Sequence, residues 1–218
     1  MNPPILSEGE GEKLLTFGEF LENYTSLSKK DRKAHKVNFT DPGGKGEACR
    51  EHYLMLENAL TPPPEAVAEA RARGLEVLVN GQYHIVPSFF LLVSELDARG
   101  LDFRIIFRTF GVDVARVASE FNMYCEGTHP VFPGIKKMDG RDGSVDRRLR
   151  LPHFSCRYHR TAVGPEGVAM AHISNDVVVI THGAQHCLDV LLKWFVDGAA
   201  HTAAIQDDYE WWAKHGER

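Results

Sequence analysis

The chain has 218 residues, of which 43% are hydrophobic and 25% are charged, and its formal net charge at pH 7 is -5. This length and composition are ordinary for a globular protein with one sizeable core. The acidic balance disfavours nucleic acid as a partner, because phosphate contacts require an excess of lysine and arginine. No apolar run approaches the roughly 20 residues that cross a bilayer, so a membrane is not an expected partner either.

The N-terminus and the cysteines favour a cytoplasmic protein. The first segment, MNPPILSEGEGEK, lacks the basic region and the apolar core of a signal peptide. The four cysteines are far apart and form no CxxC pair, so we interpret them as free thiols. They are Cys49, Cys125, Cys156 and Cys187.

The first 60 residues predict two helices separated by charged and turn-rich segments. Leu14 to Leu27 has amphipathic spacing, although Gly18 weakens it. Ser28 to Lys36 is a charged patch, and the run VNFTDPGGKG after it is rich in turn residues. Glu47 to Leu60 is the second expected helix, which the following proline triplet ends.

The middle of the chain alternates helix and strand. The expected elements are a helix over Glu65–Arg73 capped by Gly74, a brief strand over Val77–Val79, a helix over Ser88–Ala98 stopped at Gly100, a strand over Phe103–Phe107 and a helix over Val112–Phe121. Helical spacing predicts that Phe89, Leu92, Val93 and Leu96 form the buried face of the third of these. The β-branched and aromatic run of the later strand predicts cover on both of its faces.

The last third predicts a long connection, a hairpin, a strand and two helices. In chain order these are an irregular connection over 127–151, a β-hairpin from His153–Thr161 and Val168–Ile173, a strand over Val177–Thr181, and helices over Ala184–Phe195 and His201–Lys214. We therefore expect residues 1–30 to form a tail with a short helix and residues 31–218 to form one α/β domain with the hairpin at 153–173.

Three short motifs invite a ligand. The run DPGGKG lacks the spacing of a phosphate-binding P-loop, so a solvated turn explains it better. His182 and His186 have metal-ligand spacing but suggest no third ligand, and we predict no metal there. Asp207 and Asp208 form a carboxylate pair suited to a divalent cation. They fall inside the last expected helix, where capping or salt bridging explains them equally well.

Thr109 ends the strand that precedes a polar turn and a helix. Ligands of open α/β sheets bind at the carboxyl ends of strands. A threonine hydroxyl there, beside backbone amides and a helix N-terminus, suits a phosphate oxygen. The sequence therefore predicts a phosphate contact at Thr109.

Three runs carry a family resemblance. They are YHIVPSFFLLVSELDARGLDFRIIFRTFGVD, NMYCEGTHP and AIQDDYEWWAKHGE. From about Val37 onward the chain resembles a poorly characterised group related to the haloacid dehalogenase (HAD) superfamily. The resemblance implies a Rossmann-like, three-layer α/β sandwich, incomplete here and carrying a small β-hairpin insertion. It also implies phosphatase ancestry, in which a strand-end aspartate attacks the phosphoryl group, a serine or threonine binds it, and an acidic pair holds Mg²⁺.

Residue by residue, the resemblance is uneven. Thr109 matches the phosphoryl-binding position, with Asn38 and the amides around Gly111 beside it. Lys36 stands where the nucleophilic aspartate is expected, and an ammonium group cannot perform that attack. The resemblance places the later lysine and the acidic Mg²⁺ motif beyond Arg218.

Three functions stay open from the sequence. The first is a catalytically impaired HAD-like protein that keeps a site for phosphate or a phosphorylated small molecule at Thr109, Asn38 and Gly111. The second is an active phosphatase that uses Mg²⁺ and takes Asp41 as its nucleophile. The third is a non-catalytic interaction scaffold, because a fold alone does not determine function.

Overall fold

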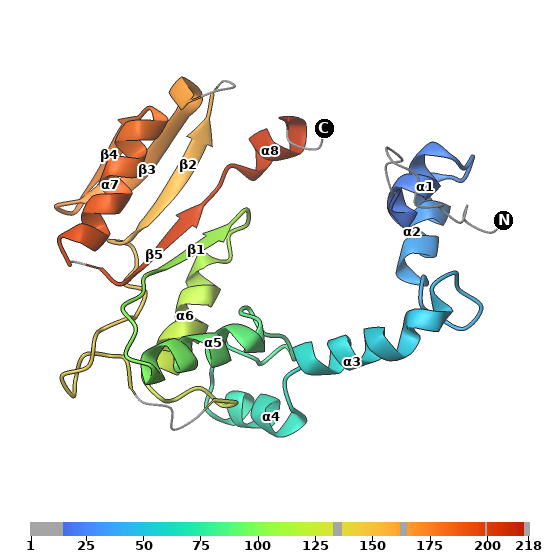
Figure 1. The fold of residues 1–218 in the computed structure, drawn as a ribbon, viewed down its shortest axis with the longest axis horizontal. Coiled ribbons are helices and arrows are strands. Elements are labelled where there is room, and N and C mark those ends of the chain that lie inside the picture. The colour runs from blue at the N-terminus through green and yellow to red at the C-terminus, as the bar shows by residue number, and fades with distance from the viewer. Residues whose placement is uncertain (1–14, 133–136, 162–164, 199, 216–218) are drawn as a thin grey trace. The chain divides into compact units, whose positions relative to one another are not determined.

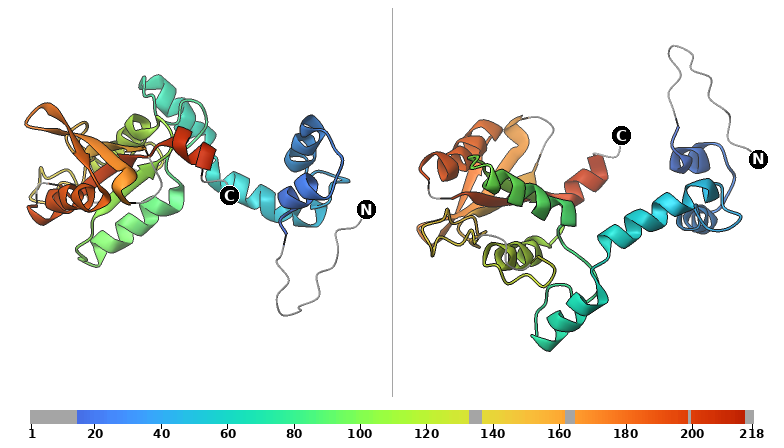
Figure 2. Two further views of the ribbon diagram at one scale, coloured as in Figure 1. Left: turned by 90° about the horizontal axis from the view of Figure 1, so that it is seen from above. Right: turned by 60° about the horizontal axis from the view of Figure 1, so that its bottom comes forward.

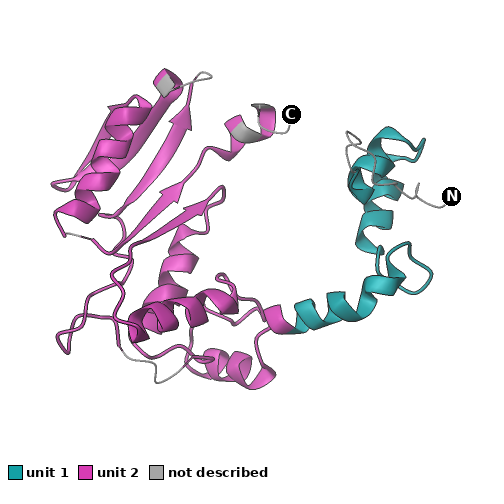
Figure 3. Cartoon of the chain, in the orientation of Figure 1, with its two compact units in different colours: residues 1–58 teal, residues 59–218 magenta. Residues whose placement is uncertain are grey.

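The structure, a computed structural model, describes residues 15–132, 137–161, 165–198 and 200–215. The chain divides into two compact units, residues 1–58 and residues 59–218 (Figure 3). The division falls inside helix α3 (Arg50–Leu60), whereas the sequence suggested that the α/β domain begins at residue 31. Among the described residues, no helix is long and apolar enough to cross a membrane.

Unit 1 is helical. Its elements are α1 (Phe17–Asn23), α2 (Lys29–Val37), the 3₁₀ turn η1 (Glu47–Cys49) and most of α3. Thr16 and Glu19 form a reciprocal capping box at the start of α1. Ser28 caps α2, so the charged patch that the sequence left unassigned is a helix. None of the residues of α2 is buried, which explains why hydrophobic periodicity did not reveal it.

Unit 2 holds the sheet and the remaining helices (Figure 1). Its elements are α4 (Pro64–Ala72), α5 (Pro87–Ala98), β1 (Ile105–Thr109), α6 (Val114–Cys125), β2 (Ser155–Arg160), η2 (Pro165–Gly167), β3 (Val168–Ser174), β4 (Val177–His182), α7 (Ala184–Val196), β5 (Thr202–Gln206) and α8 (Tyr209–His215). Gly74 and Gly100 follow α4 and α5 with φ of +65° and +66°, as their predicted C-cap roles require.

The five strands form one mixed sheet in the order β1-β5-β2-β3-β4. Strands β1, β5 and β2 are parallel to one another, and β3 and β4 continue the sheet antiparallel. The predicted hairpin is β2 and β3, and it is confirmed as a pair. It is not an insertion, because β2 also pairs with β5 and so belongs to the main sheet.

Helices cover both faces of the sheet, a layering that two further views in Figure 2 let the reader follow. Neighbouring residues of a strand point to opposite faces. On β5, Ala204 packs in the cluster built around α5 and α6, whereas Ile205 packs in the cluster that includes α7. The α/β class is therefore confirmed, as an open mixed sheet between helices.

Two local predictions are wrong, and a third is right only in part. Residues 77–79 form no strand, because Leu78 is buried with a φ of +61°, which extended backbone does not allow. Strand β1 is not covered on both faces, since it lies at the edge of the sheet and Ile106 is 48% exposed. On α5 the predicted face holds for Val93, which is buried, and for Phe89, which packs against the core, but Phe90 is buried and Leu92 is 54% exposed.

The largest correction concerns residues 201–214, which the sequence predicted as a helix. Thr202–Gln206 is instead the strand β5, and only Tyr209–His215 is helical. Alanine favours helix, but here the run Thr202–Ile205 lies between β1 and β2 and is buried on both faces. Tertiary burial therefore overrides the local preference.

Candidate functional site at the carboxyl edge of the sheet

The carboxyl ends of β1, β5 and β2 meet at one edge because the three strands are parallel. Thr109 pairs in register with Gln206, and Gln206 pairs with Arg157. All three lie on the face that α5 and α6 cover. Thr109 and Gln206 each follow by two residues a residue that packs on this face, and Arg157 pairs with Gln206 across the strands. The Arg157 guanidinium donates to Gln206 Oε1 over 3.2 and 3.3 Å. Three polar side chains thus form a row across the edge.

The loop after β1 begins with a tight local bond. The Gly111 amide donates to Thr109 Oγ1 over 3.1 Å, and the Thr109 carbonyl accepts from the Asp207 amide over 2.8 Å. A Cβ on Gly111 would lie 2.7 Å from Asp113 Oδ2, so the absence of a side chain lets this carboxylate lie over the loop. Asp113 is also the N-cap residue of α6. Thr109, Gly111 and the start of α6 therefore pack together in one turn.

A second polar group lies on the opposite face of the same edge. Asp207, with a side chain 1% exposed, binds the Arg108 guanidinium through Oδ2 and lies 3.5 Å from Arg160 Nε through Oδ1. Burial alone would raise the pKa of Asp207, but the hydrogen bond and charge of Arg108, with the charge of Arg160, lower it below its ordinary value. The carboxylate is ionised and neutralised by arginine.

Asp208 is held by the backbone instead. Its Oδ1 accepts the Trp211 amide over 3.0 Å and its Oδ2 accepts the Arg160 amide over 3.1 Å. The bond from Trp211 is the main reason that the pKa of Asp208 is lowered. The pair therefore follows a strand end, where Asp208 caps the start of α8 and Asp207 forms salt bridges, which are the two roles that the sequence offered as the alternative to a cation site. Within the described ranges, no three His, Cys, Asp or Glu side chains form a group suited to a metal ion.

A groove of about 570 Å³ runs along this edge. Its lining comes from the loop after β1, the end of β2 and the segment that leads into α8: residues 110–112, 157–159 and 206–210. Among the described residues, no carboxylate lies within ion-pair distance of the Arg157 guanidinium. The groove thus offers one arginine without a carboxylate partner among the described residues, and the row through Gln206 leads from it to the Thr109 hydroxyl. A guanidinium and a hydroxyl are donors that suit an anionic oxygen ligand.

The other predicted site residues lie in unit 1. Asp41 occupies an exposed turn, where Oδ1 binds Arg50 Nη1 at 2.8 Å. Asn38 is the C-cap of α2, and its amide donates to Ala34 over 2.9 Å. Residues 37–40 form no strand, so the first strand that the resemblance implies is absent from this part of the described chain. Lys36 binds Glu22 at 2.6 Å.

The structure thus brings Thr109 and Gly111 together and assigns Asn38 and Asp41 to the other compact unit. Sequence reasoning missed Gln206 and Arg157, because only strand pairing places Gln206 beside Thr109 and Arg157 beside Gln206. The signal for Asp207 was present, as a carboxylate pair directly after a short apolar run. The prediction of a helix there concealed it.

The histidine pair has a local structural role. His186 Nδ1 lies 3.1 Å from the carbonyl oxygen of His182, at the turn that starts α7.

A comparison of the chain with protein-family models, curated proteins and solved structures found no match. Function is therefore inferred from the chemistry of the carboxyl edge.

Proposed function

We propose that this protein binds phosphate or a phosphorylated small molecule at the carboxyl edge, and that it is a HAD-like protein of phosphatase ancestry with impaired catalysis. Thr109 and Arg157 contact the phosphoryl oxygens, and the Gly111 amide lies beside them. One observation carries the proposal. Thr109, Gln206 and Arg157 align in register on one face, and this arginine has no carboxylate partner among the described residues. The part predicted for Asn38 stays a prediction.

The contacts of the other candidates support impaired catalysis. In-line attack on phosphorus requires a carboxylate held at a fixed strand end. Asp41 instead lies in an exposed turn and is bound to Arg50, and Lys36 is bound to Glu22. Asp207 and Asp208 already accept bonds from arginine and from backbone amides. None of these groups is poised as a nucleophile.

Three finer features belong to the same proposal. A Rossmann-like, three-layer arrangement of HAD type is supported by α5 and α6 on one face of the sheet and α7 on the other. A cytoplasmic location is supported by the free thiols, because a reducing compartment keeps cysteines unpaired. The net charge of -5 supports the exclusion of nucleic acid as a partner.

Thermal unfolding with inorganic phosphate tests the binding site. Phosphate at about 100 times its dissociation constant stabilises the native state by about 2.7 kcal/mol. Chloride at the same ionic strength is the reference. Thr109→Val and Arg157→Gln should abolish the phosphate-dependent shift, whereas Arg99→Gln, which changes the exposed C-cap arginine of α5, should keep it. A wild-type protein indifferent to phosphate, or variants that respond equally, would refute the site.

Turnover of an aryl phosphate, with and without Mg²⁺, tests the catalytic part. We expect none in either condition. Mg²⁺-dependent turnover that disappears in Asp41→Asn would instead establish an active phosphatase with Asp41 as nucleophile. A protein that neither turns over the ester nor responds to phosphate would leave the interaction scaffold as the better description.

A further inference from the structure

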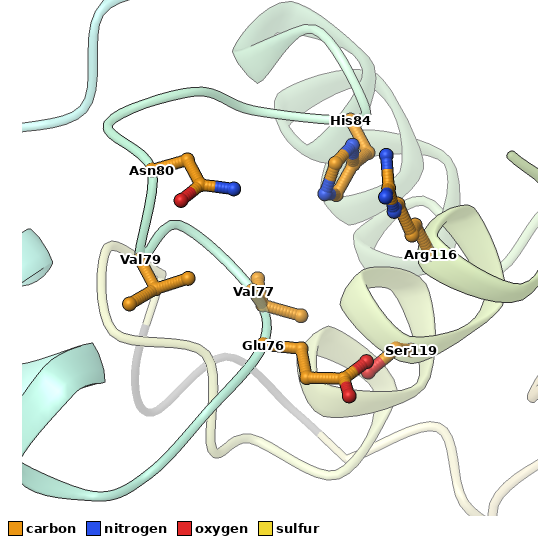
Figure 4. A pocket seen from close by; sticks show the side chains of 7 residues that line it. All are labelled: Glu76, Val77, Val79, Asn80, His84, Arg116 and Ser119. Carbon is orange, nitrogen blue, oxygen red and sulfur yellow. The ribbon is translucent and has the colours of Figure 1, made fainter.

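A second polar cavity lies away from the carboxyl edge, between the loop after α4 and the outer side of α6. It has a volume of about 260 Å³. Its lining is Glu76, Val77, Val79, Asn80, His84, Arg116 and Ser119 (Figure 4). All seven residues belong to unit 2. Nothing in the phosphate proposal uses them.

A buried glutamate on α6 holds the loop that forms the cavity. Glu120, on α6, is fully buried, and its Oε2 accepts the backbone amides of His84 over 2.7 Å and Ile85 over 3.2 Å. His129, also fully buried, lies 3.5 Å from the other carboxylate oxygen. A buried carboxylate thus ties the loop to α6, and a loop that is already held in place costs less to order when a ligand binds.

The same loop carries an unusual backbone. Leu78 is 1% exposed and has a φ of +61°, a region that disfavours a residue with a branched side chain. Backbone of this kind persists only where the surroundings enforce it, and it gathers at ligand sites. Val77 and Val79, on either side of Leu78, are among the residues that line the cavity and give it an apolar part.

The basic side chains and the acidic side chain lie at opposite ends of the cavity. In Figure 4 the His84 imidazole and the Arg116 guanidinium lie toward one end, and the Glu76 carboxylate points toward Ser119 at the other. The Asn80 amide points inward from the loop on the other side of the cavity. Asp113 lies 3.7 Å from Arg116, but an exposed pair at this distance binds weakly and leaves the guanidinium able to accept a ligand.

From this separation we propose that the cavity binds a small zwitterion of the amino-acid class. The ligand's carboxylate contacts Arg116 and His84, because a guanidinium matches a carboxylate in geometry and charge. Its ammonium group contacts Glu76 and the Ser119 hydroxyl. The small volume and the valine wall admit a short aliphatic body between the two charges. This inference is independent of the phosphate site.

The test is a titration of the full chain, followed through backbone amide chemical shifts. The probes are glycine, β-alanine and 4-aminobutyrate, which carry the same two charges at increasing separation. L-lactate and isopropylamine each carry only one of the charges. We expect at least one zwitterion to shift the amides of Gly81, His84 and Ser119 with saturation, and the two single-charge probes to bind at least about tenfold more weakly.

Variants assign the two ends. Arg116→Gln and Glu76→Gln should each weaken the best zwitterion by about tenfold or more, since each removes a charged hydrogen bond. The controls are Arg99→Gln and Glu69→Gln, exposed residues of i,i+4 pairs that do not line the cavity, and they should bind as the wild type does. Lactate or isopropylamine binding as tightly as the best zwitterion would overturn the proposal. So would no saturable shift with any probe, or unchanged affinity in both cavity variants.

Discussion

Replacing Glu120 with alanine should destabilise unit 2 more than any exposed substitution of the same residue type. The wild-type carboxylate accepts two backbone amides, those of His84 and Ile85, and the second of these residues is buried. An amide left unpaired in the interior costs about 1–3 kcal/mol, and one that water partly reaches costs less. The two together predict a loss of about 2–4 kcal/mol from the free energy of unfolding. This is a large part of the 5–15 kcal/mol typical of a domain.

Glu120→Gln distinguishes the bonds that the carboxylate accepts from the backbone amides from its contact with His129. The amide oxygen of glutamine still accepts from both backbone groups. Its NH₂ group then faces His129 Nε2, which carries a proton because Nδ1 already accepts the amides of Val131 and Phe132. Two donors therefore oppose each other, and we expect an intermediate loss of about 1–2 kcal/mol.

Urea unfolding followed by tryptophan fluorescence measures these losses, because all three tryptophans of the chain belong to unit 2. Glu95→Ala is the matched control, since this glutamate is exposed and forms only an i,i+4 pair with Arg99. Its loss should stay within about 0.5 kcal/mol. If Glu120→Ala cost no more than the control, the buried carboxylate would not be what anchors the loop.

Three further outcomes follow from burial and charge. Cys49 is exposed and the other three thiols are buried, so an aromatic disulfide reagent should modify one thiol rapidly in the native protein and four after unfolding, and Cys49→Ser should remove the rapid phase. Burial alone would raise the pKa of Asp146, but hydrogen bonds from Arg148 and Arg150 lower it to about 2. The stability that this carboxylate contributes is present above its unfolded pKa of about 3.9 and is lost as the pH falls through 2. Acid unfolding of Asp146→Asn should therefore lack this loss of stability between about pH 4 and pH 2. Phe90→Ala empties a fully buried site and should cost about 3–5 kcal/mol in the same urea experiment, and a loss below about 1 kcal/mol would contradict its place in the core.

Local patterns in the sequence determined most of the helices and the hairpin. Glycines after helical runs marked the ends of α4 and α5, and the structure gives Gly74 and Gly100 the positive φ that a C-cap needs. Alternation and a turn between residues 160 and 168 marked β2 and β3. Each of these signals acts over a few neighbouring residues, so no knowledge of the rest of the chain is required.

The buried face of α5 shows where such signals stop. Helical spacing favoured Leu92, yet Phe90 is the buried residue, because its ring packs against Tyr124, His129 and Phe132. Two of these three come from the irregular connection after α6. A contact with an irregular segment has no period, so the spacing of the helix alone does not reveal it.

For the candidate site too, the sequence determined one part and the tertiary structure the other. The sequence by itself placed Thr109 at the polar end of a strand, because an apolar run followed by a turn is a local feature. Only the tertiary structure decided that residues 202–206 form the strand beside it, and that Gln206 and Arg157 complete the row. Pairing between strands nearly a hundred residues apart depends on burial between neighbours, and local residue preferences do not encode it.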